Sequence, residues 1–95
     1  MHVISRKALR DFWERHPDSE MPLARWFKIM ECTDFGSFGD LRRAFPSADK
    51  MDDWIVFNIG GNKYRLIVSI HFNRGKVYVR HVMTHEEYMR GDWKR

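Results

Sequence analysis

The sequence predicts an α+β fold in which two N-terminal helices pack on one face of a small antiparallel sheet, with a short helical turn near the C-terminus. Apolar residues recur at helical spacing over residues 5–32. Residues 55–83 instead contain strand-like runs separated by glycine-containing turns. No repeat, low-complexity segment or linker interrupts the 95 residues. We therefore expect one domain, residues 1–95, with helices first and strands after them.

Two helices are expected in the first third of the chain, after a short edge strand or lead-in at residues 1–4. Ser5 is a suitable N-cap for the first helix, and His16-Pro17-Asp18 ends it. Asp18 or Ser19 can cap the second, because Pro22 is tolerated only in a first helical turn. The apolar stripes of the two helices are Ala8, Leu9, Phe12 and Trp13, then Leu23, Trp26, Phe27 and Met30.

The segment from residue 33 to residue 53 is expected to be mostly loop, with one helical turn at residues 40–44. Beyond it, two turns set the register of a three-stranded antiparallel sheet. A two-residue turn is expected at Gly60-Gly61 and a second turn at Arg74-Gly75. The cross-strand pairs that follow are Phe57 with Tyr64, Val68 with His81, and Leu66 with Met83.

In this register the sheet has an apolar face for the helices and a polar face. The apolar face carries Ile55, Phe57, Ile59, Tyr64, Leu66, Val68, Ile70, Phe72, Val77, Val79 and Met83. The polar face carries Asn58, Lys63, Arg65, Ser69, His71, Lys76, Tyr78 and Arg80.

Charge and composition favour a cytosolic protein that binds a polyanion. Residues 1–59 carry nine Lys/Arg and ten Asp/Glu, whereas residues 60–95 carry eight Lys/Arg and three Asp/Glu. The last third therefore has a net charge of +5, which is typical of a nucleic-acid-binding surface, although a merely solubilising face is an alternative. No secretory or membrane-spanning segment is expected, and the single Cys32 excludes an internal disulfide.

Two arginines on adjacent strands are candidates for phosphate recognition. Arg65 and Arg80 are expected on the same face, and the planar guanidinium group suits phosphate oxygens. Such a pair can hold a scissile phosphate and stabilise the charge that develops in a transition state. The alternative is a pair of solvated strand residues that limit edge-to-edge pairing. The further RNA-binding candidates are Lys63, Lys76, Tyr78, His71 and Arg74.

His85 and Tyr88 follow the last strand and are candidates for acid–base catalysis. Because they are three residues apart, they share a face if this segment is helical. RNA cleavage by the 2′-hydroxyl needs one group to remove its proton and another to protonate the leaving 5′-oxygen. Histidine suits either role, and tyrosine can donate a proton or stack on a base. The alternative is a purely structural pair. No metal site or cofactor is expected, because His81 and His85 have no evident third ligand.

Three segments of the chain together resemble the HigB toxins of bacterial type II toxin–antitoxin systems, within the wider RelE-like group. They are Phe57-Asn58-Ile59-Gly60-Gly61-Asn62-Lys63-Tyr64-Arg65-Leu66, then Tyr78-Val79-Arg80, then Thr84-His85-Glu86-Glu87-Tyr88. The segment Asp40 to Ala48 also fits the family, as does the start at Ser5 to Leu9. The resemblance implies a RelE-like fold with helices on one face of an antiparallel sheet.

The resemblance also implies a function and partners. It implies an endoribonuclease that cleaves messenger RNA in the ribosomal A site without a metal. It implies a cognate helix-turn-helix antitoxin that neutralises the toxin and, with it, binds operator DNA. The matching positions give Lys63, Arg65 and Arg80 as phosphate contacts, and His85 and Tyr88 as the acid–base pair, without assigning which is the base.

Two positions depart from the family pattern, and two other functions stay open. Met89 stands where the family often has Asp, and Ser69 stands where it often has a basic residue. The basic face alone would suffice for a non-catalytic RNA- or DNA-binding module. A degenerate toxin that only binds its antitoxin is the other alternative.

Overall fold

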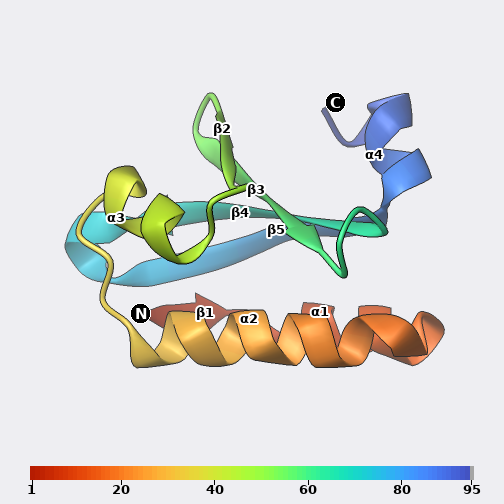
Figure 1. The fold of residues 1–95 in the computed structure, drawn as a ribbon, viewed down its shortest axis with the longest axis horizontal. Helices are drawn as coiled ribbons and strands as arrows, with labels where there is room; N and C mark the ends of the chain where they lie inside the picture. The colour runs from red at the N-terminus through yellow and green to blue at the C-terminus, as the bar shows by residue number, and fades with distance from the viewer. Residues whose placement is uncertain (95) are drawn as a thin grey trace.

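Two helices lie side by side against one face of a five-stranded sheet in the computed structural model (Figure 1). The structure describes residues 1–94, without the side chain of Asp92, so Arg95 of the expected domain lies outside it. The α+β class is confirmed. In chain order the elements are β1 His2–Ile4, α1 Arg6–Arg15, α2 Glu20–Cys32, α3 Phe38–Ala44, β2 Asp49–Met51, β3 Trp54–Ile59, β4 Tyr64–His71, β5 Lys76–Thr84 and α4 His85–Arg90.

The capping and proline signals correctly predicted where both long helices begin and where the first one ends. Helix α1 begins after Ser5, and a short 3₁₀ turn, η1 Pro17–Ser19, separates it from α2. Pro22 lies in the first turn of α2, where its missing N–H has no intrahelical acceptor to lose. The helices bury Leu9 and Phe12 from α1, and Leu23, Trp26 and Met30 from α2.

The sheet has two more strands than the three that were predicted as its body. Its order is β1-β5-β4-β3-β2, with β1 parallel to β5 and the other neighbours antiparallel. The expectation of an edge strand at residues 1–4 is confirmed. The helical turn expected at residues 40–44 is confirmed as part of α3, but strand β2 within residues 33–53 was not predicted. Strand β2 has three residues, too few for the alternation that reveals a strand.

The first hairpin has a longer turn than predicted, and its register is shifted by two residues. Phe57 pairs with Leu66 rather than Tyr64, and Ile59 pairs with Tyr64 across the four residues 60–63. Gly60 and Gly61 both have positive φ, at 62° and 71°, which glycine adopts without strain. The two glycines therefore form the first half of a four-residue turn, not the whole of a two-residue turn. A shift of two residues keeps every side chain on its expected face, because strand side chains alternate with a period of two.

A β-bulge in the second hairpin overturns part of the predicted face assignment. Val68 pairs with Val79, but Ile67 pairs with His81, so Arg80 is an extra residue in β5. The predicted pairing of Val68 with His81 was therefore wrong. Beyond the bulge the register is shifted by one residue. Met83 pairs with Arg65 instead of Leu66 and lies on the face opposite the helices.

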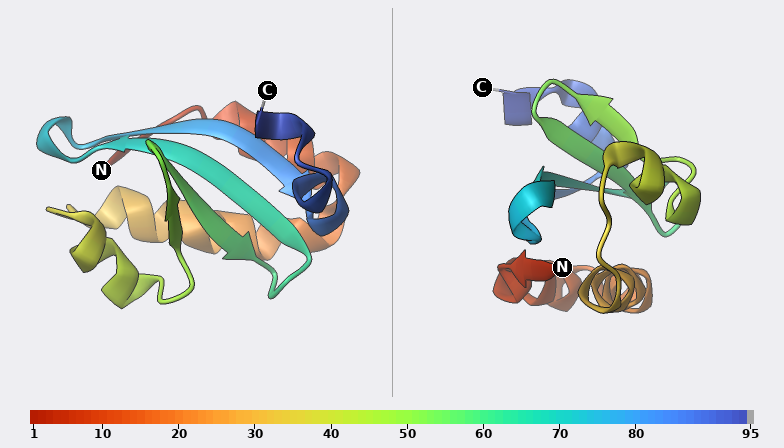
Figure 2. Two further views of the ribbon diagram at one scale, coloured as in Figure 1. Left: turned by 90° about the horizontal axis from the view of Figure 1, so that it is seen from above. Right: turned by 90° about the vertical axis from the view of Figure 1, so that its left-hand side faces the viewer.

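The main core fills the space between the two helices and the sheet. The indole of Trp26 packs edge-to-face on Phe57, with ring centroids 5.5 Å apart, and Leu66 of the central strand is fully buried. Figure 2 shows both helices beneath the sheet and α4 beyond its other face. None of the helices in the described part of the chain is long and apolar enough to span a membrane.

The face opposite the helices was predicted to be polar, but part of it is apolar. It holds a second apolar cluster, the outer cluster, whose buried residues are Val56, Ile67, Met83 and Trp93, with Met51, Trp54 and Tyr88 packed against them. The bulge supplies Met83 to this cluster, and the residues after α4 supply Trp93. Gly91, at φ 77°, turns the chain back so that Trp93 reaches the sheet.

Candidate active site

A short helix presents two of the predicted catalytic side chains at the end of β5. Thr84 and Glu87 form a reciprocal capping box, in which each side chain accepts a hydrogen bond from the other residue's backbone N–H. These contacts with Thr84, the backbone one first, hold the pKa of Glu87 below its usual value despite partial burial. The backbone N–H of His85 donates to the carbonyl of Lys63 at 2.9 Å, so α4 is tied to the turn before β4.

Arg65 and Tyr88, two of the predicted catalytic residues, lie against each other. The guanidinium carbon of Arg65 lies 5.4 Å from the centre of the Tyr88 ring. Arg65 is 8% exposed and donates to the carbonyls of Asn62 and Tyr64 at 3.3 and 3.1 Å. No carboxylate within the described residues forms a salt bridge with it. A buried cation held by neutral carbonyls is well suited to an anionic ligand.

The two predicted acid–base residues have different surroundings. The ring of Tyr88 stacks on Trp93, at 5.2 Å and 11° between planes, and its hydroxyl donates to Met51 Sδ at 3.5 Å. The His85 side chain is exposed, and its imidazole makes no hydrogen bond to the residues that the structure describes. We refer to the group formed by Lys63, Arg65, His85 and Tyr88 as the α4 end of the sheet.

Lys63 belongs to the turn and not to the polar face on which it was predicted. Its ammonium group reaches Asp18 of η1 at 3.3 Å, and the hydroxyl of Tyr64 donates to the same carboxylate. The bond from Tyr64, followed by Lys63, lowers the pKa of Asp18, and the same bond raises the pKa of Tyr64. Asp18 therefore links the helical layer to the α4 end. From the sequence, Asp18 was predicted only as a possible helix cap.

Arg80 lies further along the sheet, with its own partners. Its Nε donates to Ser69 Oγ at 3.0 Å, and its guanidinium lies 5.4 Å from the ring of Tyr78. Tyr78 packs edge-on against His71 at 5.4 Å. Ser69 is four residues beyond Arg65 on β4, so the two arginines share a face but hold different partners. The position that departs from the family pattern, Ser69, thus orients an arginine.

The remaining predicted RNA-binding residues lie at the far end of the same hairpin. Lys76 starts β5, and Arg74 lies in the turn before it; both are exposed, as is His71. With Arg80 and Tyr78 they form a basic and aromatic strip along the sheet. Met89, the other departure from the pattern, is 67% exposed.

His81 was considered as a metal ligand, and its surroundings are aromatic. It lies 5.5 Å from Trp54 and 6.4 Å from Trp93, between ring centroids. Burial, with the nearby charge of Arg80, lowers its pKa. In the part of the chain that the structure describes, no three His, Cys, Asp or Glu side chains gather as metal ligands.

The link through Asp18 gives a pH-dependent prediction for stability. Because the pKa of Asp18 is lower in the folded protein, the ionised carboxylate stabilises the fold above about pH 4. This stabilisation is lost as pH falls through the folded-state pKa. Because the pKa of Tyr64 is raised, the same bond contributes below about pH 10 and is lost as pH rises through the folded-state pKa.

We therefore expect wild type to have a higher Tm than Asp18→Asn at neutral pH, with the difference shrinking at both pH extremes. Thermal unfolding followed by circular dichroism between about pH 3 and 11 measures this difference. Asp11→Asn is the matched control, because among the described residues Asp11 pairs with Lys7 alone, on the exposed surface of α1. A Tm difference for Asp18→Asn that is independent of pH would contradict the assignment.

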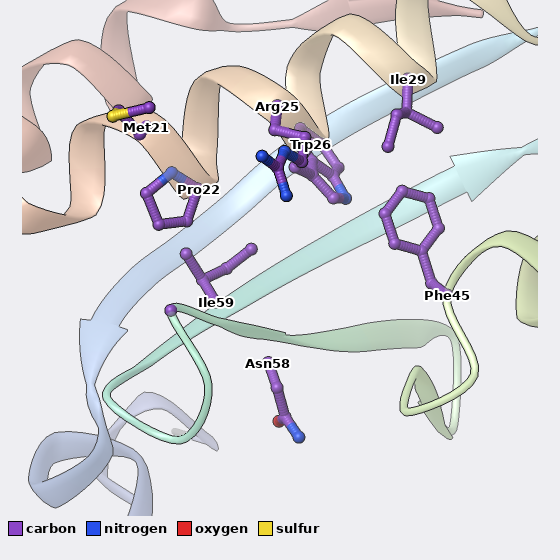
Figure 3. A pocket seen from close by; sticks show the side chains of 9 residues that line it. Met21, Pro22, Arg25, Trp26, Ile29, Phe45, Asn58 and Ile59 are labelled. Carbon is purple, nitrogen blue, oxygen red and sulfur yellow. The ribbon is translucent and has the colours of Figure 1, made fainter.

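A pocket of about 380 Å³ lies on the other side of the sheet from Arg65, between α2 and the end of β3 (Figure 3). Its walls are mostly apolar and include Trp26, Ile29 and Phe45. It shares no residue with the α4 end or with the basic strip. We therefore do not include this pocket in the candidate active site.

Comparison with known proteins gives one family and several relatives. The family model described as HigB_toxin, the RelE-like toxic component of a toxin–antitoxin system, matches residues 19–91. The mRNA interferase toxin HigB of Escherichia coli (strain K12) is 37% identical over 91 residues, which cover 93% of this chain and 88% of that protein. The mRNA interferases HigB of Shigella flexneri and Escherichia coli O6:H1 are 37% and 31% identical over the same shares.

Proposed function

The chain belongs to the HigB family of RelE-like toxic components of toxin–antitoxin systems, and on this premise we propose that its α4 end cleaves messenger RNA on the ribosome. Like its relatives, the protein is an endoribonuclease of the mRNA-interferase class. The proposal adds the place of the chemistry, its independence of a metal ion, and its dependence on translation.

The observation that carries the proposal is the environment of the Arg65 guanidinium group. Its charge is buried beside Tyr88, its hydrogen bonds go to neutral carbonyls, and no described carboxylate pairs with it. A phosphate approaching this end would meet a cation that is already positioned and partly desolvated. Preorganised donors of this kind stabilise the negative charge that builds up on the oxygens of a pentacoordinate phosphorus.

The proposed reaction uses side chains alone. The 2′-oxygen of the substrate attacks the adjacent phosphorus, and its proton passes to a base at the α4 end. The bond from phosphorus to the 5′-oxygen breaks, and that oxygen takes a proton from an acid. The products are a cyclic 2′,3′-phosphate and a 5′-hydroxyl. His85 and Tyr88 are the candidates for the two proton transfers, with Arg65 on the phosphate.

The basic strip is proposed to hold the RNA on either side of the cut. Arg80 contacts a neighbouring phosphate, and Tyr78 offers a ring on which a base can stack. Lys63 reaches phosphate by exchanging its bond with Asp18. The exposed residues Lys76, His71 and Arg74 extend the positive surface along the strand.

The proposed partners follow from the family. A cognate antitoxin with a helix-turn-helix domain binds the toxin, inhibits it and carries it to operator DNA. The ribosome presents the messenger, which places the activity in the cytoplasm. No membrane partner is proposed. One toxin domain, residues 1–95, is sufficient for the activity.

The test compares translated and untranslated messenger in a purified translation system containing EDTA-treated protein. New 5′ ends are expected on the translated messenger only, with no requirement for added metal beyond what the ribosome needs. Equal cleavage of untranslated messenger would contradict ribosome dependence. Binding to ribosomes or antitoxin without any cleavage would instead favour the degenerate toxin or the non-catalytic module.

A further inference from the structure

The pocket in Figure 3 is an apolar groove whose mouth opens on α2. Met21 at this mouth is 78% exposed and is one of two large apolar side chains that stand out in solvent among the described residues. Ile59 and Phe45 form the opposite wall. An exposed apolar side chain that continues into an apolar hollow makes this surface a candidate for contact with a partner.

Trp26 at the base of this groove carries a polar group without a partner. The residue is 2% exposed, and its indole N–H has no hydrogen-bond acceptor in the described structure. The indole nitrogen faces the end of the groove on which Ile29 and Phe45 lie (Figure 3). Buried donors are nearly always paired, because an unpaired donor has lost water without gaining an acceptor. This site therefore lacks a carbonyl or carboxylate that a partner can supply.

The groove also borders an open stretch of sheet edge. Strand β2 pairs with β3 only at residues 54–56, so residues 57–59 pair with β4 on one side and have no strand on their other side in the described part of the chain. An extended segment can add to such an edge by backbone hydrogen bonds while placing alternate side chains in adjacent pockets.

One charge at the groove indicates the character of the missing segment. Arg25 lines the groove, is exposed, and forms no salt bridge with the described residues. An acidic side chain in the partner would complement it. A polyanionic RNA does not fit here, because the walls are apolar and the strongly basic strip lies on the other face of the sheet.

We propose that this groove anchors an extended segment of the antitoxin, with an apolar residue in the pocket and an acidic residue on Arg25. A backbone carbonyl of that segment accepts the hydrogen bond of the Trp26 indole, after a shift of the side chains that cover it. The proposal rests on the proposed function in one respect, that an antitoxin binds this toxin. It places the anchor on the face opposite Arg65.

The test uses the full chain and the product of the neighbouring reading frame that suppresses its toxicity. Trp26→Phe removes the indole N–H, and we expect about 2–10-fold weaker antitoxin binding. The smaller ring also leaves a cavity in the main core, so its Tm is expected to fall and affinity is measured well below the unfolding transition. Arg25→Glu and Met21→Glu are expected to weaken binding about tenfold or more. Arg10→Glu on the exposed part of α1 and Trp54→Phe on the outer face are the matched controls, with unchanged affinity.

A spectroscopic measurement reports the hydrogen bond itself. In ¹⁵N-labelled protein the Trp26 indole signal is identified as the one lost in Trp26→Phe. On addition of antitoxin this proton is expected to move downfield, as hydrogen bonding to a carbonyl requires. An unmoved Trp26 signal with unchanged affinity of the three groove variants would overturn the proposal, as would a toxin homodimer that Met21→Glu dissociates.

These outcomes are separate from those of the proposed function. The groove variants are expected to cleave messenger like wild type when no antitoxin is present. If wild type cleaves nothing, the proposed function fails, while the titration and the indole signal still decide the groove. If the variants cleave normally and bind antitoxin normally, only the groove proposal fails.

Discussion

Replacing His85 with alanine is expected to lower the rate of messenger cleavage by about 10²–10⁴-fold, the usual contribution of a positioned acid or base. The imidazole is exposed and unbonded within the described residues, so its loss removes no packing. The link between α4 and Lys63 uses the backbone N–H of His85, which alanine retains. The variant should therefore keep the Tm of wild type.

The control for this variant is His2→Ala. His2 is also an exposed histidine, but it lies on β1 opposite Lys76, at the start of β5, whereas α4 follows the end of β5. Cleavage rates are measured with the same translated messenger for both variants. A His85→Ala protein that cleaves within threefold of the His2→Ala protein would remove His85 from the chemistry.

Replacing Leu66 with alanine is expected to destabilise the protein by about 2–5 kcal/mol, because the cavity cannot collapse between a central strand and two helices. Leu66 is fully buried in the main core, on the central strand of the sheet. For a domain of this size the loss is a large fraction of a total stability of about 5–15 kcal/mol. Urea unfolding followed by tryptophan fluorescence measures it.

Met89→Ala is the matched control, since Met89 is a large apolar residue that is 67% exposed. Its expected effect on unfolding is within about 0.5 kcal/mol. If both variants lost similar stability, the claim that Leu66 packs at the centre of the core would be contradicted. If neither did, the helices would not share one core with the sheet.

The helices could be predicted from the sequence because their signals are local. Ser5, Pro17 and Pro22 mark the ends of α1 and the start of α2 whatever they pack on. The faces of the strands were mostly predictable for a similar reason. The apolar alternation survives a two-residue error in register, so Phe57 and Leu66 face the helices in both versions.

The bulge at Arg80 could not be predicted, because no glycine or turn residue marks it in the sequence. Its effect is nonetheless large, since it sends Met83 to the outer cluster and aims Arg80 at Ser69. The outer cluster itself depends on Trp93, which returns to the sheet only through the left-handed Gly91. Contacts of this kind join segments that are distant in the chain.

Sequence reasoning predicted all four residues of the α4 end, but not how they are held. The contact of Arg65 with Tyr88 needs the short helix and the end of β4 to meet. Asp18 was invisible as a site residue, because its partners Lys63 and Tyr64 lie more than forty positions away. An acidic residue in the short turn between two helices gives no signal in the sequence that it bonds to a distant strand.

The most direct test of the central claim is to map messenger 5′ ends after translation with wild type, Arg65→Ala and Arg10→Ala. Arg10 is an exposed arginine on α1, outside the α4 end. With each protein confirmed as folded by circular dichroism, we predict cuts with wild type and Arg10→Ala, and a loss of about 10²–10³-fold with Arg65→Ala. Folded Arg65→Ala that cuts the same messenger as fast as Arg10→Ala would contradict the claim that this end performs the cleavage.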